Sequence, residues 1–144
     1  MATERHAEVS WQGSLTDGSG RIERVGTGAF GPLDVSWAAR TEEPEELTSP
    51  EELIAAAHAA CFSMALSHEL AEGGNAPERL DTRADVAFEP GKGITKIHLA
   101  VRGRVPGLDE GAFREAAEGA KAGCPVSQAL AGVPEITVEA ALES

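Results

Sequence analysis

Hydrophobic and polar positions alternate through most of the first forty residues. Segment 7–11 (AEVSW) alternates, and the TDGSG that follows it has the composition of a turn. Segments 21–26 (RIERVG) and 33–40 (LDVSWAAR) alternate again, and TGAFGP separates them. The pattern predicts an N-terminal three-stranded antiparallel meander whose third strand ends at Arg40.

The periodicity changes after an acidic stretch, TEEPEELTSP, which we expect to be a surface loop. Ser49 fits an N-cap, Pro50 a first helical residue, and Glu51 and Glu52 a first turn, with the spacing of a capping box. We expect a helix from Pro50 to about Glu72. Because residues 53–66 are apolar or small on nearly all sides, the helix is predicted to be buried, with room for a second helix from this chain or another copy.

The second half returns to alternation. LDTRADVAFEP and ITKIHLAVRGRVP predict two long strands joined by GKG, and EITVEAAL predicts a closing strand. Between them, GLDEGAFREAAEGAKAG and CPVSQALAG predict two helices. The order is βββ-α-ββ-αα-β, which indicates a single α+β domain over residues 1–144, with antiparallel sheets around a long central helix.

Composition narrows the functional classes. The 144 residues carry 12 basic and 24 acidic side chains, a formal net charge of −12. This charge argues against binding to nucleic acid or to an anionic membrane. The N-terminus lacks the apolar segment of a signal peptide, and the apolar stretch LIAAAHAACFSMAL is too short for a bilayer span, so a cytoplasmic protein is expected.

Two cysteines are the main candidates for chemistry. In a reducing compartment they form either a redox-active pair or two unrelated thiols. Cys124 precedes Pro125 and is expected to be a helix N-cap, where the helix end lowers a thiol pKa, although packing alone could explain it. Cys61 lies mid-helix, where packing is the simpler interpretation. A thiolate there would need a cation, for which its own helix offers only His58 and another segment offers Arg40.

Other kinds of site find less support. His58 and Cys61, with Cys124 or His68, could hold zinc, but the chain has no Cys-x2-Cys spacing. GTGAFG does not stand between a strand and a helix as in a dinucleotide site. The GxSxG motif of serine hydrolases is absent from the sequence.

Two longer motifs, SPEELIAAAHAACFSMALS and AKAGCPVSQAL, resemble the cysteine motifs of the OsmC/Ohr family of osmotically inducible and organic-hydroperoxide-resistance proteins. The resemblance extends over essentially the whole chain and is closer to the OsmC branch. It implies an intertwined homodimer without metal or prosthetic group. It also implies thiol-dependent reduction of organic hydroperoxides and, less efficiently, of hydrogen peroxide.

The resemblance also assigns residues. Cys61 corresponds to the peroxidatic cysteine, Cys124 to the resolving cysteine and Glu51 to the active-site glutamate. Arg40 corresponds best to the active-site arginine, with Arg21, near the position used by Ohr-type proteins, as the alternative. An external dithiol, carried by a lipoyl-bearing or thioredoxin-like protein, would reduce the resulting disulfide.

Helix geometry adds one expectation. At about 1.5 Å per residue, Glu51 and Cys61 lie roughly 15 Å apart along one helix. We therefore expect Glu51, Arg40 or both to reach Cys61 from the partner subunit.

Two alternatives to a peroxidase are a non-enzymatic small-molecule or lipid-binding module and a slow redox sensor. The full set of Arg40, Glu51, Cys61 and Cys124 favours the enzyme over a binding module, which would not need it.

Overall fold

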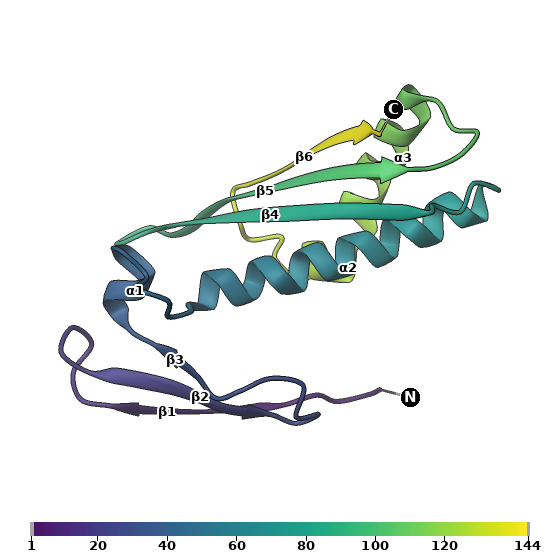
Figure 1. The fold of residues 1–144 in the computed structure, drawn as a ribbon. Coiled ribbons are helices and arrows are strands. Elements are labelled where there is room, and N and C mark those ends of the chain that lie inside the picture. The colour runs from purple at the N-terminus through teal and green to yellow at the C-terminus, as the bar shows by residue number, and fades with distance from the viewer. Residues whose placement is uncertain (1, 144) are drawn as a thin grey trace. The chain divides into compact units, whose positions relative to one another are not determined.

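A computed structural model describes residues 2–143 of the chain, and Figure 1 shows the order of its elements. The chain divides into two compact units, residues 1–53 and 54–144. A single domain over residues 1–144 stays a prediction.

The first unit contains the expected meander. Strands β1 (Ala7–Gln12), β2 (Ser19–Val25) and β3 (Leu33–Val35) form an antiparallel sheet in that order, which confirms the prediction.

The predicted third strand, however, is too long. The Ser36 side chain accepts a hydrogen bond from the Ala39 amide and begins a short helix, α1 (Trp37–Thr41). Arg40 therefore lies in a helical turn, because a local N-cap replaces strand pairing after Val35.

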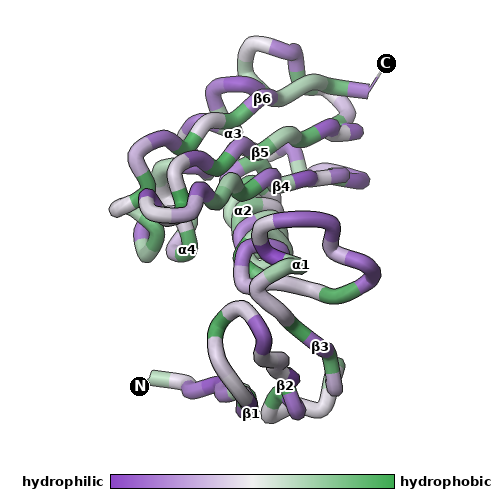
Figure 2. Tube along the Cα trace, turned by 90° about the vertical axis from the view of Figure 1, so that its left-hand side faces the viewer, coloured by the Kyte–Doolittle hydropathy of each residue, from purple (hydrophilic) through white to green (hydrophobic). Residues whose placement is uncertain are grey.

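Helix α2 (Pro50–Glu72) begins where the sequence predicts. The Ser49 hydroxyl accepts a hydrogen bond from the Glu52 amide at 3.1 Å, and both Glu51 and Glu52 lie in the first turn. These acidic side chains complement the positive end of the helix dipole. The helix begins in the first unit and continues through the second. Figure 2 shows it nearly end on, with much of its trace in the pale to green colours of apolar residues.

The second unit is a three-stranded sheet with helices on one face. Strands β4 (Arg79–Glu89) and β5 (Gly93–Arg104) pair antiparallel, as expected. Strand β6 (Glu135–Leu142) pairs parallel with β5, so the prediction of antiparallel sheets is wrong for this one pair. The physical reason is the crossover through α3 (Glu110–Gly123) and α4 (Pro125–Ala129), which is long enough to return the chain in the same direction.

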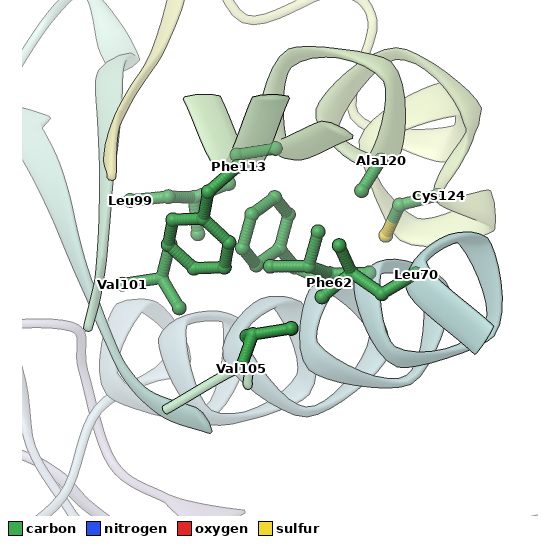
Figure 3. Close-up of a cluster of buried hydrophobic side chains, with 10 residues drawn as sticks. Phe62, Leu70, Leu99, Val101, Val105, Phe113, Ala120 and Cys124 are labelled. Carbon is green, nitrogen blue, oxygen red and sulfur yellow. The ribbon is translucent and has the colours of Figure 1, made fainter. Parts of the chain in front are cut away.

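The core of this unit lies between β5 and helices α2 and α3. Phe62 from α2 and Phe113 from α3 are fully buried beside Leu99 and Val101 of β5 (Figure 3). Gly103 leaves the space that the Phe113 ring fills, since a Cβ atom at Gly103 would lie 2.6 Å from Cζ of that ring.

Helix α2 is buried on one face only. Its buried positions in the second unit are His58, Phe62, Leu66 and Leu70. The opposite face presents Ala56, Ala60 and Met64 to solvent, and Met64 is 71% exposed. The expectation of a helix buried on nearly all sides is therefore wrong for a single chain.

The helix also extends beyond the apolar stretch on which the sequence expectation about membranes was based. By length and composition alone α2 could cross a bilayer, a test that core helices of soluble proteins also pass. Its buried face packs into the same core as β5 and α3.

Candidate active site

Arg40 and Glu51 form a bidentate ion pair within the first unit. The Arg40 Nε donates to Glu51 Oε1 at 2.9 Å, and an Arg40 Nη donates to Oε2 at 2.8 Å. The Glu51 side chain is 8% exposed and that of Arg40 is 28% exposed. The guanidinium also lies 5.8 Å from the centroid of the Trp37 ring, so α1 contributes both a cation and a surface for it. Two parallel hydrogen bonds fix the orientation of the guanidinium plane.

Arg21, the alternative arginine, has a different partner. Its Nε donates to Asp34 Oδ1 at 3.0 Å across the β2–β3 pair, and both side chains are about half exposed. The structure thus pairs Glu51 with Arg40.

The two cysteines belong to the second unit, and both are free thiols. Cys61 is half-buried on α2 at the edge of the core cluster, whereas Cys124 is completely buried within it. Cys124 ends α3 through its amide, which donates to the Ala120 carbonyl, and it is the N-cap of α4. Its sulfur points toward α2 in Figure 3.

The surroundings act on the two thiols in opposite directions. Burial raises the pKa of Cys61, and its contact with Cys124 raises this pKa further, while the backbone of Val126 lowers it. Burial also acts to raise the pKa of Cys124. Hydrogen bonding with the Ser127 backbone, the Cys61 thiol, the Ser127 hydroxyl and the Val126 backbone outweighs it and lowers that pKa.

Cys124 is therefore the more acidic thiol of the pair, in line with its expected place at a helix end. Its sulfur makes no cap hydrogen bond of ordinary geometry, so it benefits from nearby N–H groups without a fully formed cap. A thiolate at Cys61 needs a cation in addition to the groups that set its pKa here.

A buried polar contact links the helices that carry the cysteines. His58 Nε2 lies 2.6 Å from Ser127 Oγ, and both residues are buried. Burial lowers the pKa of His58 and so favours the neutral imidazole. The sequence suggested His58 only as a neighbour of Cys61 or a zinc ligand, and Ser127 was missed. Its place three residues after the N-cap Cys124 was the available signal.

The described residues give the zinc alternative no support. Within residues 2–143, no three His, Cys, Asp or Glu side chains come together as a metal site requires.

Comparisons with known proteins agree with the motifs. A family described as OsmC-like protein matches residues 43–139. The chain is 42% identical over 147 aligned positions to the peroxiredoxin OsmC of Escherichia coli (strain K12), covering 100% of both chains. It is 29% identical to an organic hydroperoxide resistance protein of Xanthomonas axonopodis pv. citri, covering 73% of this chain and 80% of that one.

Solved structures share the fold. An OsmC-like protein from Mycoplasma pneumoniae aligns with a TM-score of 0.72 at 16% identity, over 100% of both chains. The organic hydroperoxide resistance protein OhrB of Bacillus subtilis aligns with a TM-score of 0.62 at 25% identity, over 96% of this chain and 98% of that one.

Proposed function

Because this chain belongs to the OsmC family, we propose that it is a thiol peroxidase that reduces organic hydroperoxides and, less efficiently, hydrogen peroxide. The names of its relatives support a peroxide-related redox function. The observation that carries the finer proposal is the meeting of Cys61 and Cys124, two free thiols that interact at one place in the core.

The first step takes place at Cys61. Its thiolate attacks one oxygen of the hydroperoxide, the O–O bond breaks, and the other oxygen leaves as alkoxide, which takes up a proton to become an alcohol. Cys61 becomes a sulfenic acid, two electrons having passed from sulfur to peroxide. Cys61 suits this step because it is partly accessible, whereas Cys124 is completely buried.

The second step joins the two sulfurs. The Cys124 thiolate attacks the sulfur of the sulfenic acid, an S–S bond forms, the S–O bond breaks, and hydroxide leaves and is protonated to water. A dithiol on a lipoyl-bearing or thioredoxin-like protein then exchanges with the disulfide and restores both thiols. This cycle needs a reducing compartment, and a cytoplasmic location is part of the proposal.

The Arg40–Glu51 pair would supply the cation that a Cys61 thiolate needs. A guanidinium beside Cys61 would stabilise the thiolate and then the charge that develops on the peroxide oxygens. Because Arg40 and Glu51 are bound to one another, we propose that they act as a unit and reach Cys61 from the partner subunit of a homodimer.

Single-turnover oxidation by cumene hydroperoxide tests the roles of the thiols. We expect Cys61→Ser to lose the fast reaction. Cys124→Ser should still react once and accumulate a sulfenic acid that dimedone traps. A Cys61→Ser protein that reacts at the wild-type rate would overturn the assignment, and a wild-type protein that does not consume the peroxide would overturn the function.

Mixed dimers test the shared site. Cys61→Ser and Arg40→Ala chains, each inactive alone, should recover part of the activity in purified heterodimers, because one of the two sites then contains both native residues. The matched control pairs Cys61→Ser with Cys124→Ser, which leaves Arg40 intact in both chains. An absence of recovery in verified Cys61→Ser/Arg40→Ala heterodimers would contradict delivery of Arg40 from the partner.

A further inference from the structure

His58 and Ser127 make a buried polar contact between the helix of Cys61 and the helix that Cys124 caps, and the proposed cycle does not use it. His58 is three residues before Cys61 on α2, and Ser127 is three residues after Cys124 on α4. Their Nε2 and Oγ atoms are 2.6 Å apart, with His58 0% and Ser127 7% exposed. A hydrogen bond between two buried groups is stronger than one in water, because the local dielectric constant is low.

The unpartnered nitrogen of His58 indicates which atom donates. Nδ1 of His58 is buried without a hydrogen-bond partner. A neutral imidazole carries one hydrogen, and leaving a buried N–H unpaired is rarer than leaving an acceptor unpaired. The hydrogen is therefore assigned to Nε2, which donates to the Ser127 hydroxyl oxygen.

This assignment leaves the hydroxyl hydrogen of Ser127 available for a second acceptor. The Cys124 sulfur belongs to the N-cap of the same short helix, three residues earlier, and the Ser127 hydroxyl is among the groups that lower the Cys124 pKa. Donation of this hydrogen to the sulfur would complete a chain of donors from His58 Nε2–H through Ser127 Oγ–H to Cys124 Sγ. The chain begins on the helix that carries Cys61 and ends on the sulfur that would attack it.

On the basis of the proposed function, we propose that His58 and Ser127 are positioning residues, forming a buried relay that orients Cys124 and stabilises its thiolate for attack on oxidised Cys61. Ser127 acts on the sulfur directly, and His58 acts through Ser127. The relay assists only the disulfide-forming step, in which the Cys124 electron pair makes the S–S bond and hydroxide leaves Cys61. The peroxide-dependent step at Cys61 does not involve it.

The first test measures the acidity of Cys124 without peroxide. In a Cys61→Ser background Cys124 is the one thiol of the chain, and the sequence has no Tyr to contribute tyrosinate absorbance. We expect Ser127→Ala to reduce the thiolate fraction near neutral pH about tenfold, as for loss of one hydrogen bond to a charged group. His58→Leu should have a similar effect, and His58→Gln, which keeps an N–H donor, should recover part of it.

The second test measures disulfide closure in the native-cysteine protein after one equivalent of cumene hydroperoxide. Closure should slow about tenfold in Ser127→Ala, with the rate of the first step unchanged. The matched control is Ser63→Ala, which removes another part-buried serine hydroxyl, bonded to Thr82 Oγ1 at 2.7 Å. This control should leave both the acidity of Cys124 and the closure rate within about twofold of the parent.

Two results would overturn the relay. One is an unchanged Cys124 thiolate fraction in Ser127→Ala, a variant that nearly preserves the size of the buried side chain and keeps the test valid if His58→Leu does not fold. The other is an equal effect of Ser63→Ala. Failure of the proposed peroxidase function is seen separately, as wild-type protein that does not consume peroxide, since the thiol titration uses none.

Discussion

At the scale of single residues, the more acidic cysteine is not the more accessible one. Cys124 has the lowered pKa but is completely buried, whereas Cys61 has the raised pKa but is partly exposed. A peroxide can reach only an accessible thiol, so accessibility favours Cys61 for the first attack. The cost is that Cys61 depends on a cation, and this dependence gives Arg40 its proposed role.

Replacing Arg40 by Lys tests whether the geometry of that cation matters. Lys keeps the charge but loses the two parallel hydrogen bonds to Glu51, so we expect the second-order rate constant for cumene hydroperoxide to fall at least about tenfold. Arg21→Lys is the matched control, because Arg21 is paired with Asp34, and it should change the rate less than about twofold. A larger loss in Arg21→Lys would reverse the assignment of the arginine.

His58 predicts a pH dependence of stability. Its folded-state pKa lies below the ordinary value of 6.5, so the unfolded chain binds the proton more readily. Its contribution to the free energy of unfolding is therefore complete above pH 6.5. The contribution falls as the pH drops through this value toward the lower, folded-state pKa.

Urea denaturation at a series of pH values measures this effect. The decrease in the free energy of unfolding between about pH 7 and pH 5 should be smaller in His58→Gln than in wild type. An identical slope in the two proteins would show that His58 is not held neutral by the fold.

At the scale of elements, the sequence predicted local structure well where hydrogen bonds are local. The Ser49-Pro50 start of α2 and the meander were read correctly because caps, turns and alternation are properties of neighbouring residues. The parallel pairing of β6 was not, since it depends on where the crossover returns the chain. Helix α1 was missed because WAAR is compatible with alternation as well as with a helical turn, and only the Ser36 cap decides between them.

The packing of β5 against α3 depends on the absence of a side chain at Gly103. In Gly103→Ala the new methyl group would press on the Phe113 ring, and we expect a loss of about 1–3 kcal/mol in the free energy of unfolding. The matched control is Gly132→Ala, where a Cβ atom meets nothing within 4 Å. Equal urea denaturation midpoints for the two variants would contradict this account of the β5–α3 contact.

At the scale of the whole molecule, the proposed site combines a pair from the first unit, Arg40 and Glu51, with two thiols from the second, Cys61 and Cys124. The family resemblance assigned Arg40, Glu51, Cys61 and Cys124 to the site, and their catalytic roles stay predictions. Periodicity alone could not pair Arg40 with Glu51, since that contact joins two helices through their side chains. The exposed stripe of Ala56, Ala60 and Met64 on α2 is a surface on which a second small-residue helix could pack closely, as the proposed homodimer requires.

A charge on this stripe tests the homodimer. Met64→Lys should shift the protein toward monomer and lower its peroxidase rate at least about tenfold, because burying an unpaired charge is costly and the site would lose its partner residues. Sedimentation and activity can be measured on the same samples. Ala122→Lys, at an exposed position of α3, is the matched control and should remain dimeric. Dimeric and active Met64→Lys would place the interface elsewhere.

The position of Cys124 in the core has a consequence for the stability of the protein during peroxide stress. In each proposed turnover a Cys61–Cys124 disulfide would link α2 to the start of α4 and would then be reduced. The disulfide closes a loop of about 60 residues, and a cross-link of that span raises the free energy of the unfolded chain by about 4 kcal/mol. When peroxide arrives faster than the reductant, molecules would accumulate in the disulfide form, which has a higher free energy of unfolding than the reduced form. The form that is most stable against unfolding would therefore be most abundant when peroxide is most abundant.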